Sequence, residues 1–246
     1  MLSKARIKFI KSLQVKKYRK QEQSFVVEGA KSVIELLRSD FDTEVVVASA
    51  GFIRSYASIL KKNREVIEAT EKELAQLGSF QTNDAALAVA KMKANKMPHL
   101  KDEFCLVLDD LHDPGNVGTI IRTADWYGIQ NIVASEQTAD FYNPKTISAT
   151  MGSFTRVNIF YTNLTDFLSK NKLPVYGTLM QGDNVHRAVF GSSGLIVIGN
   201  ESNGISEEVM PFITHPITIP QLGGAESLNA AIATGIVLDN LCRSKE

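Results

Sequence analysis

Short apolar runs alternate with helix-like segments throughout the second half of this sequence, and this alternation restricts the fold more than any other feature. Strands are predicted at 104–111, 131–135, 156–162, 174–180, 195–199 and 217–220. Helices are predicted between and after them, near 116–127, 143–151, 164–171, 185–188, 206–210 and 226–241. Strands that alternate with helices at this spacing indicate a mainly parallel sheet covered on both faces. We therefore expect an α/β fold for this half.

The first half carries a smaller α/β pattern of its own. Its strands are predicted at 24–29, 43–49, 66–70 and 85–92, and its helices at 3–20, 30–39, 52–62 and 71–79. The segment 93–103 is charged, contains Pro98 and lacks apolar periodicity, which is typical of a linker. The predicted domains are 1–95 and 104–246, joined by a linker over 96–103.

Two strand-to-loop passages follow each other near the C-terminus. The run LIVIG (195–199) ends in a polar, glycine-containing loop over 200–204. The run ITIP (217–220) ends in a second such loop over 221–225, before a helix of small residues. Ligands of open α/β sheets bind where strands end in loops, and glycine lets a ligand approach the bare backbone. These loops predict a pocket built mainly from main chain.

The charge of the chain is unevenly distributed, although the formal net charge is zero. Residues 1–103 hold 19 Lys and Arg against 13 Asp and Glu, whereas residues 104–246 hold 8 against 14. The first twenty residues contain no acid and eight bases, namely Lys4, Arg6, Lys8, Lys11, Lys16, Lys17, Arg19 and Lys20. Such a run indicates a polyanionic partner such as nucleic acid. A solvated helix face is the alternative.

The first strand of the second half runs into a helix that carries Arg122 away from its buried stripe. Gly118 lies one turn earlier on the same face, so the Arg122 side chain can lie across it and reach toward Asn116. A guanidinium there would hold a phosphate through its planar fork. The alternative is a surface arginine paired with Asp125 or Asp109.

Several functional classes lack their signatures. There is no G-x-G-x-x-G or Walker A motif, which disfavours a dinucleotide or P-loop site. Without a G-x-S-x-G elbow, Ser227 is a poor candidate for a hydrolase nucleophile, and Ser227 and Asn229 could simply cap a helix. No His, Cys or carboxylate cluster has metal-ligand spacing, so no metal is expected.

The chain is expected to be a cytoplasmic protein. No apolar run approaches the roughly 18–20 residues of a membrane span. The basic N-terminus lacks the apolar core and cleavage site of a secretory signal. Cys105 and Cys242 lie far apart and fit no redox spacing, so both are interpreted as buried or idle thiols in a reducing compartment.

Three sequence patches carry a resemblance to a known family. They are N-x-G-x-x-x-R-T-A from Asn116 to Ala124, I-G-N-E-x-x-G-I from Ile198 to Ile205, and I-P followed by E-S-L-N-A-A-I-A from Ile219 to Ala233. In this order and spacing they resemble the SpoU (TrmH) family of RNA 2′-O-ribose methyltransferases, in the SPOUT superfamily. KYR (17–19) and FVVEGAKSV (25–33) resemble the ribosomal-protein-like RNA-binding domain that precedes the catalytic domain in this family.

The resemblance implies a C-terminal trefoil knot, a homodimer and S-adenosylmethionine as cofactor. Residues matching the cofactor site are Thr178, Gly199, Ile219, Leu222 and Leu228. Residues matching the catalytic set are Asn116, Arg122, Glu201, Ser227 and Asn229. RNA contacts are assigned to Lys4, Lys8, Lys11, Lys16, Lys17, Arg19 and Lys20.

The implied activity is methyl transfer to a ribose 2′-hydroxyl of structured RNA, with ribosomal RNA favoured by the basic first domain. A transfer RNA methyltransferase, or a non-catalytic RNA-binding or ribosome-assembly factor on the same fold, is the alternative. Ser148 stands near the place where the family often has an arginine, which leaves the RNA target open. The proton acceptor, whether Glu201, water or the phosphate, is also open.

Overall fold

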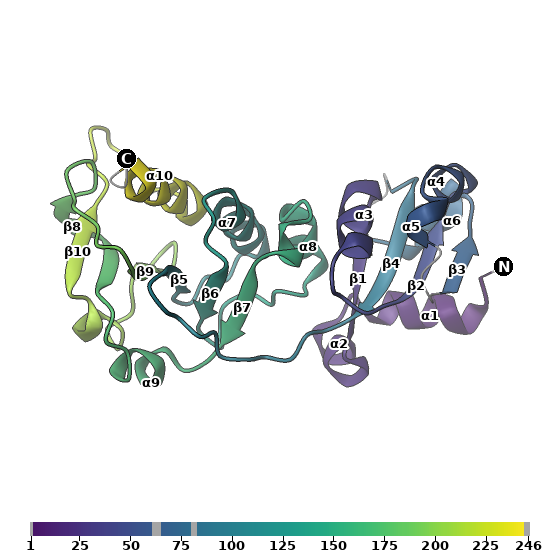
Figure 1. The fold of residues 1–246 in the computed structure, drawn as a ribbon, viewed down its shortest axis with the longest axis horizontal. Coiled ribbons are helices and arrows are strands. Elements are labelled where there is room, and N and C mark those ends of the chain that lie inside the picture. The colour runs from purple at the N-terminus through teal and green to yellow at the C-terminus, as the bar shows by residue number, and fades with distance from the viewer. Residues whose placement is uncertain (1, 61–64, 80–82, 244–246) are drawn as a thin grey trace. The chain divides into compact units, whose positions relative to one another are not determined.

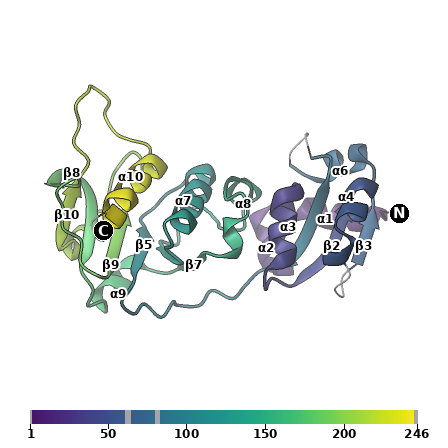
Figure 2. The ribbon, with the colours of Figure 1, turned by 45° about the horizontal axis from the view of Figure 1, so that its top comes forward.

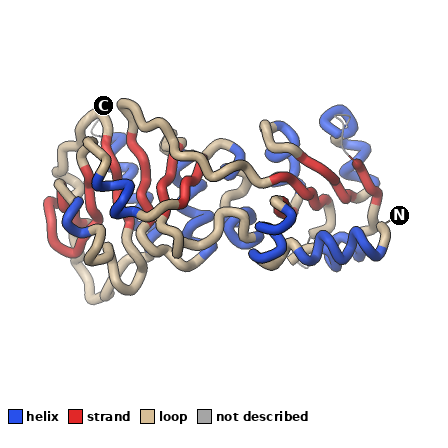
Figure 3. Tube along the Cα trace, turned by 90° about the horizontal axis from the view of Figure 1, so that it is seen from below, coloured by secondary structure: helices blue, strands red, loops and turns tan. Residues whose placement is uncertain are grey.

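A computed structural model describes residues 2–60, 65–79 and 83–243. The chain forms two compact units (Figure 1). Unit 1 contains residues 1–94 together with 140–155, and unit 2 contains 95–139 and 156–246. Between the last strand of the first half and the first strand of the second, residues 92–103 contain no helix or strand (Figure 3). None of the helices in the described ranges is both long enough and apolar enough to span a bilayer.

Unit 2 is built on a six-stranded sheet with the order β10-β8-β9-β5-β6-β7. Its strands are β5 (Phe104–Leu108), β6 (Asn131–Ala134), β7 (Asn158–Tyr161), β8 (Val175–Asn184), β9 (Gly194–Ile198) and β10 (His215–Thr218). Every neighbouring pair is parallel, which confirms the predicted parallel sheet. The central strands β5 and β9 are buried along their whole length, as expected for apolar strands covered on both faces.

Two long helices of unit 2 pack against each other, α7 (Pro114–Trp126) and α10 (Ala230–Arg243) (Figure 2). The shorter elements are α9 (Leu164–Ser169) and the 3₁₀ turn η2 (Met210–Phe212). Helix α7 begins where the Asp113 carboxylate caps the Asn116 amide, and it buries the predicted apolar stripe. Helix α10 begins four residues later than predicted, because the Asn229 side chain caps its first turn.

Two short helices predicted for unit 2 are absent. Residues 185–187 form a turn, because β8 extends to Asn184 by pairing with the edge strand β10. Pairing shifts register between Pro216 and Ile217, and this shift gives the second part of β8 a partner. Residues 207–209 also form a turn, which leads into η2.

Unit 1 holds a four-stranded sheet with the order β1-β4-β2-β3. Strand β4 is antiparallel to β1 and β2, and β2 is parallel to β3. The strands are β1 (Ser24–Glu28), β2 (Thr43–Ala48), β3 (Glu65–Glu68) and β4 (Ala86–Lys91). The helices of the first half are α1 (Lys4–Ser12), α2 (Lys16–Glu22), α3 (Ala30–Arg38), α4 (Ala50–Ser55), α5 (Ala57–Leu60) and α6 (Glu71–Leu77). The end of the helix predicted over 52–62 lies outside the described residues.

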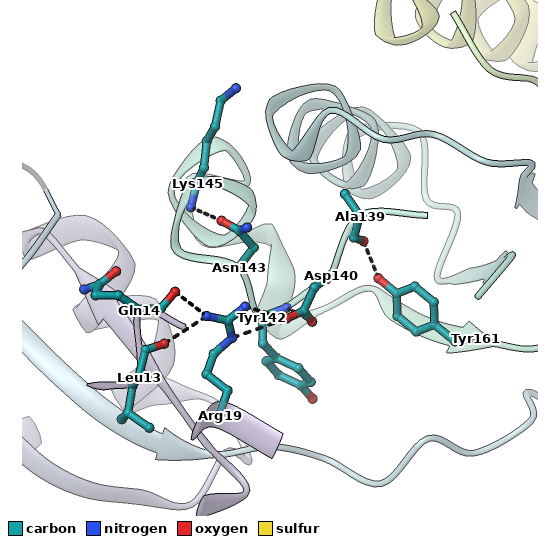
Figure 4. A network of polar contacts seen from close by, with 9 residues as sticks. All are labelled: Leu13, Gln14, Arg19, Ala139, Asp140, Tyr142, Asn143, Lys145 and Tyr161. Atoms are coloured by element: carbon teal, nitrogen blue, oxygen red, sulfur yellow. Dashed lines mark hydrogen bonds and ion pairs between the residues drawn. The ribbon is translucent and has the colours of Figure 1, made fainter. Parts of the chain in front are cut away.

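The predicted helix over 3–20 is two helices, because Arg19 folds back on the break between them. Its guanidinium donates hydrogen bonds to the main-chain carbonyls of Leu13 (2.9 Å) and Gln14 (2.8 Å). Arg19 also pairs with the Asp140 carboxylate at 2.6 Å (Figure 4). These hydrogen bonds satisfy carbonyls that a continuous helix would have used internally.

Residues 140–155 come from the predicted second domain but complete the core of unit 1. They contain α8 (Pro144–Ala149), which packs on β1, and the 3₁₀ turn η1 (Ser153–Thr155). The buried Phe154 ring makes edge or tilted contacts with Phe25 and Phe41 at centroid distances of 6.1 and 5.8 Å. The ring centroids of Tyr142 and Phe25 lie 4.6 Å apart. Buried aromatic surface therefore ties this segment to the first half of the chain.

Candidate functional site

A cavity of about 620 Å³ opens in unit 2 where the loops after β9 and β10 meet the start of α10. This volume lies within the range of small-molecule sites, about 300–1,000 Å³. All five residues predicted to contact a cofactor line it, namely Thr178, Gly199, Ile219, Leu222 and Leu228. The Thr178 hydroxyl donates a hydrogen bond to the Val197 carbonyl at 3.0 Å, which holds that side chain against β9.

The wall after β9 is a tight backbone loop that requires glycine at its start. A Cβ atom on Gly199 would lie 2.2 Å from the carbonyl carbon of Gly204 and 2.3 Å from the Ile205 nitrogen. Reciprocal main-chain hydrogen bonds of 2.8 and 2.9 Å join Asn200 to Gly204 and close the loop. The backbone of this loop therefore packs tightly on itself beside the cavity.

Three of the predicted catalytic residues form one chain of hydrogen bonds. Asn116 donates from Nδ2 to the Glu201 carboxylate at 2.7 Å, and Asn229 donates from Nδ2 to Asn116 Oδ1 at 2.9 Å. Asn229 Oδ1 accepts from the main-chain amides of Ala231 (3.0 Å) and Ile232 (3.3 Å). A carboxylate at one end and helix amides at the other fix the orientation of both side-chain amides. These hydrogen bonds thereby join the first turn of α7, the loop after β9 and the N-cap of α10.

The other two predicted catalytic residues lie outside this chain. Ser227 lines the cavity and is exposed. It does not cap α10, because Asn229 does. Arg122 is exposed on α7, and its guanidinium makes no hydrogen bond or ion pair with any other residue that the structure describes. No hydrogen bond joins it to Asn116 among the described residues.

The carboxylates considered as surface partners for Arg122 have other partners. Asp125 is bonded by the Arg156 guanidinium at 2.8–3.1 Å. Asp109 accepts from the Ser206 main-chain amide at 2.7 Å. The alternative of a surface ion pair for Arg122 is therefore not what the fold adopts.

The side of the cavity formed by residues 221–229 is open to solvent. Leu222 is fully exposed and Leu228 is 47% exposed, although both line the cavity. Apolar side chains that face solvent beside a cavity gain favourable free energy when a ligand or another surface covers them.

Asp109 is a buried carboxylate that sequence reasoning considered only as a partner for Arg122. Burial raises its pKa, the Ser206 amide and hydroxyl act in the opposite direction, and the neighbouring charge of Asp110 raises it further. Its sequence signal was a pair of acids directly after a buried apolar strand.

The lysines of unit 1 that were assigned to RNA are all exposed, namely Lys4, Lys8, Lys11, Lys16, Lys17 and Lys20. Tyr18, 41% exposed, adds an aromatic surface beside Lys17. Arg19 is different, since it is only 2% exposed and its guanidinium is bound to Asp140 and two carbonyls. The prediction that Arg19 contacts RNA is therefore corrected: it is an internal structural residue.

Metal-ligand side chains do not gather in the part of the chain that the structure describes. None of its His, Cys, Asp and Glu residues form a group of three or more that could hold an ion. Cys105 is buried in β5, and this burial raises the pKa of its thiol.

Comparison with known proteins gives matches to both units. Residues 103–239 match the model of the SpoU rRNA Methylase family, and residues 4–88 match that of an MRM3-like substrate binding domain. The chain is 30% identical over 241 residues to the 23S rRNA (guanosine(2553)-2′-O)-methyltransferase RlmP of Bacillus subtilis (strain 168). That match covers 96% of this chain and 95% of the relative.

Solved structures match nearly the whole chain. A TrmH-family protein from Porphyromonas gingivalis has a TM-score of 0.89 and 36% identity, with 98% of each chain covered. An AdoMet-bound rRNA methyltransferase from Sinorhizobium meliloti has a TM-score of 0.88 and 29% identity, with 99% of this chain and 96% of that one covered. The cavity and the hydrogen-bond chain therefore lie in a fold shared along the full length of these proteins.

Proposed function

The chain belongs to the SpoU rRNA methylase family, and from this we propose that it transfers a methyl group from S-adenosylmethionine to a ribose 2′-hydroxyl of ribosomal RNA. The observation that carries the proposal is the Glu201–Asn116–Asn229 hydrogen-bond chain beside a cavity lined by the loops after β9 and β10. An rRNA methyltransferase of the same fold is known with AdoMet bound.

The residues around the cavity fit this methyl donor. Gly199 leaves no room for a side chain, so the adenosyl group would meet peptide groups directly. Gly199, Ile219 and Leu228 would hold it through their backbone, with Thr178 and Leu222 beside them. When bound, S-adenosylmethionine would supply an activated methyl group: the 2′-hydroxyl oxygen would bond to the methyl carbon and lose its proton, while the carbon–sulfur bond breaks and leaves S-adenosylhomocysteine.

The protein's own side chains then have to orient the ribose and favour loss of that proton. A guanidinium offers donors and no acceptor, so Arg122 acts as a phosphate ligand rather than a base. Its positive charge beside the sugar lowers the pKa of the 2′-hydroxyl. Ser227 orients the ribose from the cavity wall, while Asn229 and Asn116 fix Glu201 at the strand end.

Unit 1 supplies affinity for RNA. Six exposed lysines on α1 and α2 contact phosphates, which positions the RNA without reading its sequence. The match of residues 4–88 to a substrate binding domain supports this role.

Two further features belong to the proposal. The tail from β10 to α10 forms a trefoil knot that carries the cavity loops, and two copies of the chain form a dimer. Support for the dimer comes from Trp126 on α7 and Ile232 on α10, which are 83% and 57% exposed on packed helices. Large apolar side chains such as these gain favourable free energy when a partner surface covers them.

The direct test is nucleoside mass spectrometry. Ribosomal RNA from cells lacking the protein should lack one 2′-O-methyl nucleotide, which purified protein and S-adenosylmethionine restore in vitro. Loss of a methylated nucleotide from transfer RNA alone would assign the other RNA class. If both RNAs are unchanged and the purified protein binds RNA without methylating it, the protein is a non-catalytic factor and the proposal fails.

A further inference from the structure

We propose that Asp109 and Asp110 are positioning residues that fix both ends of the loop 199–206, here called the pocket loop, and so place Glu201 on Asn116. Neither aspartate lines the cavity. The inference rests on the proposed function, because the pocket loop is a wall of the methyl-donor site.

The first anchor is the Asp109 carboxylate at the end of the pocket loop. Asp109 directly follows β5 and is 3% exposed. Its Oδ2 accepts from the Ser206 main-chain amide at 2.7 Å, and its own amide donates to the Ile198 carbonyl at 2.9 Å. Removing the carboxylate would leave the Ser206 amide without this partner, and an unpaired amide in the interior is unfavourable.

The second anchor is the Asp110 carbonyl at the start of the pocket loop. It accepts from Asn200 Nδ2 at 2.6 Å. The same Asn200 side chain accepts from the amides of Ser202 (2.9 Å) and Asn203 (3.2 Å), which curls the loop around it. Two consecutive residues of one strand end therefore hold positions 200 and 206 of the loop.

Asp110 is itself held in an uncommon backbone conformation. Its φ is +54°, in the left-handed region that aspartate tolerates better than most residues. Ser135, directly after β6, fixes it there: Ser135 Oγ accepts from the Asp110 amide at 3.0 Å and donates to Asp110 Oδ1 at 2.6 Å. The ends of β5, β6 and β9 are thus joined through Asp110.

These anchors leave the pocket loop little freedom. Glu201 lies between them, and Gly199 already packs backbone against backbone at the loop's base. Glu201 therefore reaches Asn116 at 2.7 Å without a search among loop conformations. Misplacement of a site residue by about 1 Å can cost about 100-fold in rate, so an anchor outside the cavity has functional weight.

The test compares Asp109→Ala, Asp109→Asn and Ser135→Ala in the full-length protein. Hydrogen exchange of the 199–206 amides, calorimetric binding of S-adenosylmethionine, and kcat and KM for RNA methylation would be measured. Asp109→Ala should speed exchange of the Ser206 amide, weaken methyl-donor binding about tenfold and lower kcat. Asp109→Asn keeps an acceptor oxygen, so it should restore most of the protection of the Ser206 amide, of the methyl-donor affinity and of kcat.

Glu103→Ala is the matched control. Glu103 precedes the other end of β5, where its carboxylate accepts from the Asn131 side chain at 2.9 Å. This variant should leave exchange in the pocket loop and methyl-donor binding unchanged. If Asp109→Ala behaves like Glu103→Ala, the proposal is overturned.

The experiments distinguish a failure of this inference from a failure of the proposed function. If Asp109→Ala does not fold, Ser135→Ala still tests the second anchor, because it removes only a hydroxyl and should speed exchange at residues 200–203. Unchanged exchange at residues 200–203 would refute the proposal that Asp110 holds the pocket loop. If the wild-type protein binds no S-adenosylmethionine, the proposed function fails, while the exchange measurements still decide whether the two aspartates hold the loop.

Discussion

Arg122 combines three properties that a phosphate ligand needs. It is exposed, its guanidinium is a fork of hydrogen-bond donors, and the acids considered as its partners are bound by Arg156 and Ser206. A guanidinium without a partner among the described residues can turn toward an incoming RNA without first breaking an ion pair.

Replacing Arg122 should therefore separate chemistry from methyl-donor binding. Arg122→Ala is expected to lower the methylation rate by at least about 100-fold, because it removes the charge that the proposed mechanism places beside the reacting group. Calorimetry should show methyl-donor affinity within about twofold of wild type, because the variant removes no side chain from the cavity wall. Arg122→Lys should recover only part of the rate, because lysine lacks the fork. Loss of methyl-donor binding in Arg122→Ala would contradict this division of roles.

Gly199 allows a steric prediction. Gly199→Ala would place a methyl group 2.2 Å from the Gly204 carbonyl carbon, so the pocket loop must shift. We expect a loss of about 1–3 kcal/mol in the free energy of unfolding, together with weaker methyl-donor binding. Gly51→Ala is the control, because nothing lies within 4 Å of its added Cβ and it sits in α4. Denaturant titration that gave the two variants equal stability would refute the close approach.

At the scale of elements, the sequence predicted the helices and strands that depend only on the apolar pattern of their own residues. The β-branched runs became strands in a parallel sheet, and the stripe Val117, Ile120, Ile121 and Ala124 became the buried face of α7. The extension of β8 was missed, because it depends on a partner strand more than thirty residues away. The break between α1 and α2 was missed because Asp140, far along the chain, helps to hold Arg19 there.

The site shows the same limit. Glycine-bearing loops after apolar strands predicted a main-chain pocket, and the residues named for it do line the cavity. The roles of Asp109 and Asp110 could not be read from sequence, since a hydrogen bond from Ser206 or Asn200 depends on how distant loops pack. Sequence places polar groups at strand ends, and tertiary packing decides their partners.

The helices α1 and α2 and their junction carry the prediction for RNA affinity. Lys16→Gln combined with Lys17→Gln should weaken RNA binding and flatten its dependence on salt, by about 0.7–0.9 in the logarithmic slope for each phosphate that the protein no longer neutralises. The control pair is Lys170→Gln with Lys172→Gln, two exposed lysines of unit 2. Filter binding at several salt concentrations would measure both, and equal slopes would argue against the basic helices as the RNA surface.

At the scale of the whole molecule, the buried Arg19–Asp140 pair links residues distant in sequence within unit 1. Asp140→Ala would leave a 2%-exposed guanidinium without its carboxylate, for which about 3–5 kcal/mol of destabilisation is expected. Asp40→Ala breaks the Lys93–Asp40 pair, whose acid is 74% exposed, and should cost at most about 1 kcal/mol. Thermal or denaturant unfolding would compare them, and similar values would show that burial does not set the strength of the first pair.

The proposed dimer makes Trp126 a further target. Trp126→Glu should convert a dimer to a monomer in sedimentation experiments, because a charge replaces an 83%-exposed apolar side chain at the proposed interface. Met97→Glu, at a 61%-exposed position in the linker, is the control and should leave the sedimentation coefficient unchanged. A wild-type monomer, or a Trp126→Glu dimer, would exclude this face.

The insertion of residues 140–155 into the core of unit 1 has a consequence for biosynthesis. Phe25, Phe41 and Arg19 leave the ribosome early, but the aromatic and acidic side chains that cover them are translated only after β5, α7 and β6. Unit 1 therefore cannot complete its core before this later segment is translated, whereas N-terminal domains generally fold first during synthesis. Unit 1 can be completed only after part of unit 2 has emerged, which couples the folding of the two units in time.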